Sequence, residues 1–137
     1  MEIMNGGKAL MKALEKEGVK QVFGLPGGAN LPMYDELYKS NIRHILVRHE
    51  QSAAHMADGF GRVSRKPGVC FATSGPGSTN LLTGIATAQA DSAPMIAVTG
   101  QVPVKMIGRD AFQESDIIGM SNPCVKYAFQ PRTPEEI

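Results

Sequence analysis

The sequence predicts an α/β fold built on a mostly parallel sheet with helices on both of its faces. Apolar, strand-like runs alternate along the chain with segments of helical spacing. The strand-like runs are also continuously apolar, which is typical of strands that helices bury on both sides. At 137 residues the chain is long enough for one hydrophobic core, so we expect residues 1–137 to form a single domain.

The first helix and strand are expected within residues 5–25. Residues 5–18 place alanine and leucine on one face and lysine and glutamate on the other, as in an amphipathic helix. Gly18 can end that helix, because glycine readily adopts the left-handed conformation of helix ends. The apolar run 19–25 predicts a strand, which ends at the Pro-Gly-Gly-Ala-Asn loop of residues 26–30.

A second helix and strand lead to a third helix. Residues 31–39 return to helical spacing, and Pro32 is acceptable there because it lies in the first turn. The apolar run 42–47 predicts the second strand, and the small residues of 51–62 predict a helix after it. This order places Glu50 between the carboxyl end of a strand and the start of a helix.

The third and fourth strands follow the same pattern. The apolar run 68–73 enters the Ser-Gly-Pro-Gly turn of residues 74–77, after which residues 81–90 predict a helix. A fourth strand is expected at 94–100. Beyond a loop punctuated by glycine and proline, with a short helix, a fifth strand is expected at 124–129.

The end of the sequence resembles the start of another helix. Thr133 is a favourable N-cap and Pro134 a favourable first helical residue. We therefore expect a fragment of a longer protein, whose domain is cut short at the C-terminus with a sheet edge left unpaired.

Composition excludes several classes of protein. The formal net charge of +1 gives no indication of nucleic-acid or anionic-membrane binding. The sequence contains neither an apolar run of transmembrane length nor an N-terminal signal segment. Cys70 and Cys124 are far apart, and we expect both to be free, buried thiols of a cytoplasmic protein.

No metal site is expected from the histidines and the clustered acidic residues. His49 and His55 are six residues apart, which does not place them on one helix face, and the third histidine is His44. We interpret the histidines as solvated or hydrogen-bonded side chains. Three acidic residues, Asp110, Glu114 and Asp116, are interpreted as a solvent-exposed face.

Two glycine-rich turns follow strands, at residues 24–28 and 74–77. Glycine lets a ligand approach the backbone, and a helix N-terminus beyond the turn suits an anion. A dinucleotide is disfavoured, because the spacing is not G-x-G-x-x-G and Pro26 lacks a backbone donor. A Walker motif is also absent, since no G-K-[ST] follows either turn. The pair of turns predicts a ligand site of another kind.

Five runs in order carry a family resemblance: residues 22–29, 48–51, 72–80, 99–103 and 107–114. Together they resemble the N-terminal pyrimidine-binding domain of the thiamine-diphosphate enzymes, most closely the catalytic subunit of the acetolactate synthase (acetohydroxyacid synthase) family. The Gln-Val-Pro run at 101–103 and the Asp-Ala-Phe-Gln-Glu run at 110–114 favour acetolactate synthase within that superfamily.

The resemblance implies a transferase that joins pyruvate, with loss of carbon dioxide, to a second 2-keto acid in branched-chain amino acid biosynthesis. It implies thiamine diphosphate as cofactor, with Mg²⁺ and FAD held by domains that this sequence lacks. It also implies a homo-oligomer in which a neighbouring subunit contributes the diphosphate-binding domain, and it allows a regulatory subunit. The isolated chain is expected to be inactive.

The resemblance also implies roles for individual residues. Glu50 would hydrogen-bond the aminopyrimidine ring nitrogen and favour the imino tautomer, which demands an apolar, dry site. Gln113 would orient a substrate beside the reacting carbon. The cofactor-binding positions are Pro26, Gly27, Gly28, Glu50, Thr73, Pro76, Asn80 and Gln113. The substrate-channel positions are Ala29, Pro103, Ala111 and Phe112, although plain loop packing explains Ala29 and Ala111 equally well.

Two alternatives stay open. The chain resembles, less closely, the pyrimidine-domain chain of a two-chain thiamine-diphosphate decarboxylase of the sulfopyruvate or phosphonopyruvate type; the run at 110–114 argues against it. A non-catalytic interaction module could also keep the fold. The joint presence of Glu50, Pro76, Asn80 and Gln113 argues against that alternative.

Overall fold

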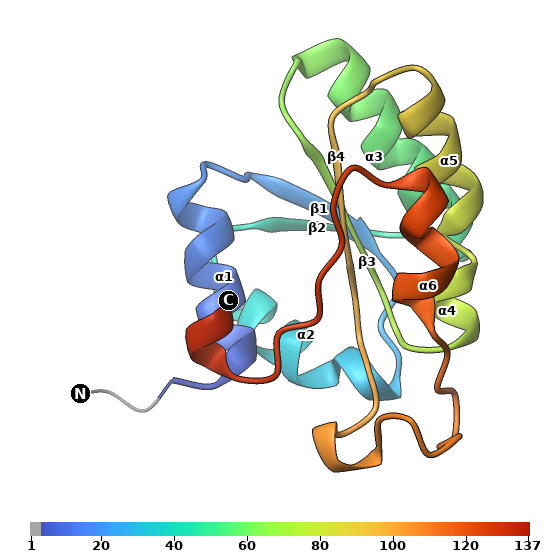
Figure 1. Ribbon diagram of the computed structural model, residues 1–137. Helices are drawn as coiled ribbons and strands as arrows, with labels where there is room; N and C mark the ends of the chain where they lie inside the picture. Colours follow the sequence, from blue (N-terminus) through green and yellow to red (C-terminus); the bar gives the residue numbers. More distant parts are fainter. Residues whose placement is uncertain (1–3) are drawn as a thin grey trace.

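The computed structural model describes residues 4–137, so residues 1–3 of the expected domain lie outside it. Four parallel strands form one sheet in the order β2-β1-β3-β4 (Figure 1). The strands are β1 (Gln21–Gly24), β2 (Arg43–Leu46), β3 (Gly68–Ala72) and β4 (Met95–Thr99). The predicted fold class is confirmed.

Helices cover both faces of this sheet (Figure 1). The longer helices are α1 (Gly6–Lys16), α2 (Leu31–Tyr38), α3 (Glu50–Ser64) and α5 (Leu82–Ala90). The short helical segments are η1 (Gly28–Asn30), α4 (Pro76–Thr79), η2 (Val104–Met106), α6 (Ile117–Ser121), η3 (Asn122–Cys124) and η4 (Pro134–Glu136). The eight helices and strands predicted up to residue 100 are all present, with ends shifted by two residues or fewer.

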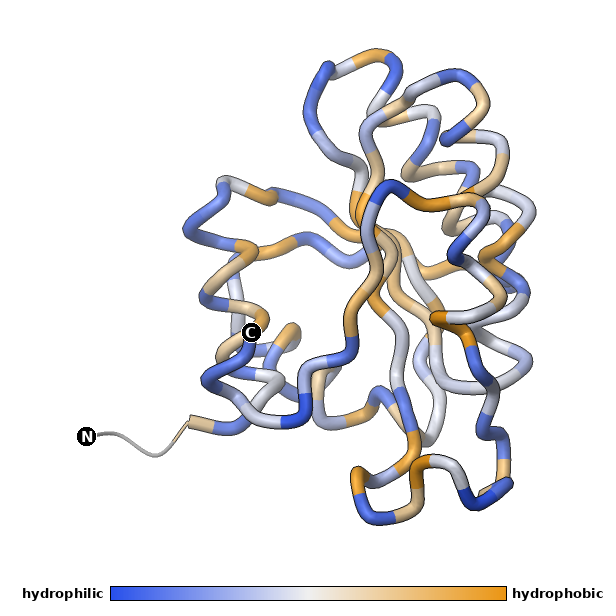
Figure 2. Tube along the Cα trace, viewed as in Figure 1, coloured by the Kyte–Doolittle hydropathy of each residue, from blue (hydrophilic) through white to orange (hydrophobic). Residues whose placement is uncertain are grey.

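The core lies in two layers because successive residues of a strand point to opposite faces. Val69 and Phe71 of β3 pack with the buried residues of α1 and α2. Cys70 and Ala72 pack with those of α3 and α5. All five residues of β3 are buried, which explains its continuous apolar run. Figure 2 shows the hydrophobic residues along these central strands.

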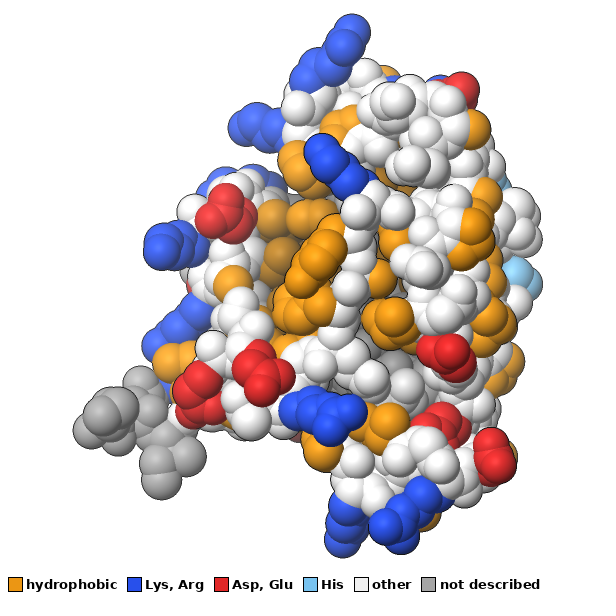
Figure 3. Space-filling view, viewed as in Figure 1, with side chains coloured by type: hydrophobic (Ala, Val, Ile, Leu, Met, Phe, Trp, Pro, Cys, Tyr) orange, Lys and Arg blue, Asp and Glu red, His pale blue; other side chains and the backbone are white. Residues whose placement is uncertain are grey.

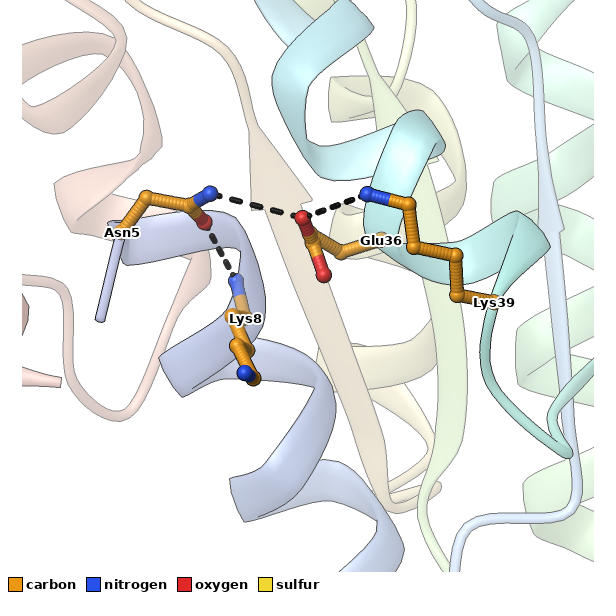
Figure 4. Close-up of polar contacts among 4 residues, drawn as sticks. All are labelled: Asn5, Lys8, Glu36 and Lys39. Atoms are coloured by element: carbon orange, nitrogen blue, oxygen red, sulfur yellow. Dashed lines mark hydrogen bonds and ion pairs between the residues drawn. The ribbon is translucent and has the colours of Figure 1, made fainter. Parts of the chain in front are cut away.

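Helices α1 and α2 are joined at their polar surfaces (Figure 4). Asn5 caps α1 by accepting the Lys8 N–H at its Oδ1, 2.8 Å away, and its Nδ2 donates to Oε1 of Glu36 at 3.4 Å. Lys39 Nζ lies 2.9 Å from the same oxygen. Hydrogen bonds from Lys39 and Asn5 lower the pKa of the Glu36 carboxyl. These contacts link α1 to α2 at the surface, above their shared apolar cluster.

The predicted fifth strand is wrong. Residues 125–130 contain no strand, and in Figure 1 this segment crosses over the sheet instead of extending it. Cys124 and Val125 pack their side chains against the cluster around α3 and α5, so this segment covers the core without pairing its backbone. Tyr127 and Phe129 remain 79% and 56% exposed. Figure 3 shows hydrophobic side chains on this face.

Thr133 is the N-cap of η4, as predicted. η4 begins at Pro134 as expected, but the Thr133 side chain makes no capping hydrogen bond. Oε2 of Glu136 instead accepts the Arg132 N–H at 2.6 Å. The end of the first helix is as predicted, with Gly18 at a φ of 77°.

The cysteines are both free, as expected. Cys70 is fully buried, and burial raises the pKa of its thiol to about 12, whereas Cys124 is only partly buried. Across residues 4–137, every helix is too short or too polar for a membrane span.

Candidate functional site

The carboxyl ends of the four parallel strands meet at one edge of the sheet, where open α/β sheets bind ligands. The predicted site residues follow these ends: the loop 26–30 after β1, Glu50 after β2, and residues 73–80 after β3. In Figure 1 this edge lies toward the bottom, where α4 and the start of α2 approach the sheet.

Glu50 is the first residue of α3 and only 8% exposed. His49 precedes it as N-cap in an extended conformation, and its Nδ1 accepts the Gln51 N–H at 3.1 Å. Oε2 of Glu50 accepts a hydrogen bond of 3.0 Å from Nδ2 of Asn80. Within residues 4–137, no hydrogen bond occupies the other oxygen, Oε1. A buried carboxylate therefore keeps one acceptor for a ligand.

Gly77 keeps the space beside that acceptor open. A Cβ at this position would lie 3.2 Å from Oε1 of Glu50 and 2.6 Å from Cγ2 of Thr73. Gly77 is itself buried in α4. Any larger residue would press on the carboxylate and on Thr73, so glycine is required by a close approach rather than by its φ.

Thr73 joins the two glycine turns. Its Oγ1 accepts the Ala29 N–H at 3.2 Å. A Cβ at Gly27 would lie 2.7 Å from Cβ of Thr73, so the first turn packs directly on the residue that follows β3. The predicted pairing of the two turns at one edge is therefore observed.

Asn30 fixes the first turn, and sequence reasoning missed it. It is 2% exposed, its Oδ1 accepts the Gly27 N–H at 2.7 Å and its Nδ2 donates to the Leu25 carbonyl at 3.3 Å. Asparagine commonly bonds backbone groups a few residues away. Its position directly after the glycine loop is the signal that could have found it. Pro26 and Gly28 lie exposed on the same turn.

The second turn contacts the late loop. Gly75 adopts a φ of 55°, and a Cβ there would lie 2.5 Å from the Gln113 carbonyl oxygen. Ser78, also missed by sequence reasoning, is 1% exposed; its Oγ donates to the Gly75 carbonyl at 2.8 Å. It also lies 3.4 Å from Oγ of Ser115. The structure thus brings Gln113 to the edge through its backbone.

The predicted channel residues are only partly brought together. Ala29 packs against Gly100, where a Cβ would lie 2.9 Å from the Ala29 carbonyl carbon. Pro103 and Phe112 are exposed, Phe112 to 89%, and Ala111 is half-buried. Pro76 and the Gln113 side chain are also exposed.

His44 and Asp116 make structural contacts. His44 Nε2 lies 3.3 Å from the Tyr34 hydroxyl and 3.2 Å from the Gly24 carbonyl, and burial lowers its pKa. Asp116 caps α6 through its side chain. The described residues hold no cluster of three or more His, Cys, Asp or Glu side chains suited to a metal ion.

The arrangement suits a flat, polar ring. A buried carboxylate oxygen can accept a ring N–H, an amide holds the second oxygen, and glycines open the backbone on two sides. A family model described as "Thiamine pyrophosphate enzyme, N-terminal TPP binding domain" matches residues 4–120. The chain belongs to this family. Thiamine pyrophosphate is thiamine diphosphate, so the superfamily resemblance of the sequence is confirmed.

Several similar proteins are named as acetolactate synthases or their large subunits. The chain is 64% identical over 134 residues to the "Probable acetolactate synthase large subunit" of Methanocaldococcus jannaschii, covering 98% of this chain and 23% of that protein. It is 52% identical over 134 residues to the isozyme 2 large subunit of Escherichia coli, covering 98% and 24%. The chain therefore spans about a quarter of the length of these relatives.

Proposed function

We propose that this chain is the aminopyrimidine-binding domain of an acetolactate synthase, with residues 1–137 acting as one unit. The parent reaction would be the decarboxylative condensation of pyruvate with a second 2-keto acid, in branched-chain amino acid biosynthesis. The observation that carries the proposal is Glu50, a buried carboxylate with one oxygen paired to Asn80 and the other available. The acetolactate synthase relatives support the choice of reaction.

Thiamine diphosphate, when bound, supplies the carbanion chemistry that amino-acid side chains lack. Glu50 Oε1 would hydrogen-bond the aminopyrimidine ring nitrogen and hold a proton there. Asn80 stops the carboxylate from turning away, because its amide occupies Oε2 at 3.0 Å. The low exposure of Glu50, 8%, limits the water that can compete for that oxygen. Glu50 is thus the catalytic residue that this chain contributes to cofactor activation.

The two glycine turns form the walls around the ring. Gly27 and Gly28 offer backbone that a ring can approach, with Pro26 at the rim. Thr73 spaces the two turns, since it contacts both Gly27 and Gly77. On the second turn, Pro76 and Asn80 complete the cofactor-binding set, which also includes Gln113.

The substrate side is formed by the late loops. Gln113 orients the carboxylate or carbonyl of the 2-keto acid, and Phe112 supplies an apolar contact beside it. Ala29, Pro103 and Ala111 line the channel toward this pair. Ala29 already packs against Gly100, at the carboxyl end of β4.

The other half of the active site comes from elsewhere. We propose that a diphosphate-binding domain of a neighbouring subunit, with Mg²⁺, covers this edge in a cytoplasmic homo-oligomer that also binds FAD. Such a complex also offers a place for a regulatory subunit. Large hydrophobic side chains near the edge, including Phe112 at 89% and Val104 at 53% exposure, are consistent with a covering partner. The chain alone should therefore form no acetolactate.

A chimera tests the proposal. This chain replaces the aligned segment of the Escherichia coli isozyme 2 large subunit, to which it is 52% identical. The proposal predicts that the purified chimera converts pyruvate to acetolactate only when thiamine diphosphate is present. The unmodified relative is the positive control. An inactive but correctly folded chimera, or acetolactate formed by the 137-residue chain alone, would contradict the proposal.

A further inference from the structure

The loop that carries Phe112 and Gln113 is closed by one side chain. The Glu114 N–H donates to the Ala111 carbonyl at 2.9 Å, which closes a four-residue turn. The Ala111 N–H donates back to Oε2 of Glu114 at 3.0 Å. Two hydrogen bonds between Ala111 and Glu114 therefore close the turn, one between backbone groups and one from the Ala111 N–H to the Glu114 carboxylate.

The second oxygen of the same carboxylate reaches further back along the loop. Oε1 of Glu114 accepts the Gly108 N–H. The backbone N–H groups of Gly108 and Ala111, with smaller contributions from Arg109 and Asp110, lower the pKa of the Glu114 carboxyl. Backbone amides that converge in this way form an anion-binding concavity, and here the anion is the protein's own carboxylate.

These hydrogen bonds to Glu114 stabilise a loop in which two residues have unfavourable backbone conformations. Asp110 and Gln113 have φ angles of 52° and 57°, in the left-handed region where glycine is normally found. Gln113 is the second central residue of the turn, the position at which a type II turn requires a positive φ. Non-glycine residues stay in this region only where their surroundings impose it, and such sites are often functional.

The far end of the loop rests on the site edge. The Gln113 carbonyl lies against Gly75, and the Ser115 carbonyl accepts a 3.5 Å hydrogen bond from Nε2 of Gln101. Glu114 therefore lies between an anchored segment and the exposed tip formed by Phe112 and Gln113. Its carboxylate accepts hydrogen bonds from two backbone amides of its own loop.

We propose that Glu114 is a positioning residue for the reaction: its carboxylate fixes the turn that aims Phe112 and Gln113 at the substrate. The proposal rests on the proposed function for the role of Gln113. Glu114 acts through the turn and does not itself touch substrate or cofactor. Removing it should release the tip of the loop while leaving the sheet, Glu50 and the glycine turns in place.

The first test measures amide hydrogen exchange in the 137-residue chain by NMR, without cofactor. Glu114→Ala should accelerate exchange of the Gly108 and Ala111 amides by about tenfold, the loss expected for a hydrogen bond to a charged acceptor. Glu114→Gln keeps one acceptor oxygen and should give a smaller increase. Glu135→Gln, on η4, is the matched control. Unchanged exchange in Glu114→Ala, or an equal rise in the control, would overturn the proposal.

The second test places Glu114→Gln in the chimera with the Escherichia coli relative. We expect kcat to fall by about tenfold and the affinity for thiamine diphosphate to fall much less, through Gln113, because Glu50 and Asn80 are untouched; the melting temperature should not change. A general structural defect would instead lower cofactor affinity and the melting temperature together, and that result would overturn the proposal, as would an unchanged kcat. An inactive unsubstituted chimera would reject the proposed function, while the exchange measurement would still decide whether Glu114 holds the turn.

Discussion

Asn80 donates its side-chain N–H to Oε2 of Glu50 at 3.0 Å, and so links the turn after β3 to the first residue of α3. The two residues are 30 positions apart in the sequence, and they meet because the start of α3 and the turn after β3 both lie at the carboxyl edge of the parallel sheet. The bond fixes one oxygen of a buried carboxylate and leaves the other for a ligand.

Asn80→Ala should destabilise the protein and weaken cofactor binding. The substitution leaves a buried carboxylate oxygen without its donor, which costs about 1–3 kcal/mol. Chemical denaturation of the 137-residue chain measures the loss of stability, with Asn122→Ala, at an exposed residue of η3, as the control. Equal stability of the two variants would show that the Asn80–Glu50 bond contributes nothing measurable.

Gly77→Ala should be destabilising because its Cβ would lie 2.6 Å from Cγ2 of Thr73. Overpacking of this kind costs about 1–3 kcal/mol. Thr73→Ser removes the Cγ2 methyl, so the double variant Gly77→Ala/Thr73→Ser should recover much of the loss.

Gly28→Ala is the matched control, since a Cβ at Gly28 meets nothing within 4 Å. The comparison measures thermal unfolding of the unsubstituted chain, Gly77→Ala, Gly77→Ala/Thr73→Ser and Gly28→Ala. If the double variant is no more stable than Gly77→Ala, the steric explanation is wrong.

Asn30→Ala should loosen the first glycine turn. It removes the acceptor of the Gly27 N–H and the donor to the Leu25 carbonyl in a side chain that is 2% exposed. We expect a loss of about 2 kcal/mol, since each broken bond leaves a backbone group poorly satisfied. Asn30→Asp keeps the acceptor but sets a buried carboxylate oxygen against the Leu25 carbonyl, so in urea denaturation it should lose at least as much stability as Asn30→Ala. A loss in Asn30→Ala no larger than in Asn122→Ala would contradict this prediction.

Stability should decline in alkaline solution through Cys70. Burial raises the pKa of this thiol from 9.0 to about 12, so the unfolded chain ionises first. The contribution of the buried, protonated Cys70 thiol to the free energy of unfolding is complete below pH 9. It is lost between pH 9 and 12, by at most about 1.4 kcal/mol per pH unit. Unfolding free energies of the protein and of Cys70→Ala measured from pH 8 to 11 check this. Identical slopes would contradict it.

The sequence was sufficient for most of the fold because the central strands are buried on both faces. The continuous apolar run of β3 exists because Val69 and Cys70 point to different layers of the core. The order of elements likewise placed Glu50 at the carboxyl edge of the sheet. The fifth strand failed because an apolar segment can cover a core with its side chains, as Val125 does, without pairing its backbone.

The polar contacts that organise the site were much harder to predict. Ser78 contacts Ser115 across 37 positions, and such a contact depends on where two loops meet in space. Glu114 looked like part of a solvent-exposed acidic face, but its carboxylate bonds backbone amides within its own loop. Residue type alone does not distinguish these two environments.

The central claim is that Glu50 activates the cofactor, and the most direct measurement is proton exchange at the thiazolium C2 of bound thiamine diphosphate. Exchange into deuterium oxide is followed by rapid quench and NMR in the chimera with the Escherichia coli relative, with and without Glu50→Gln. Because positioned proton transfer contributes about 10²–10⁴-fold, Glu50→Gln should slow exchange by at least about a hundredfold. Equal exchange rates in the two proteins, with the cofactor bound to both, would contradict the account.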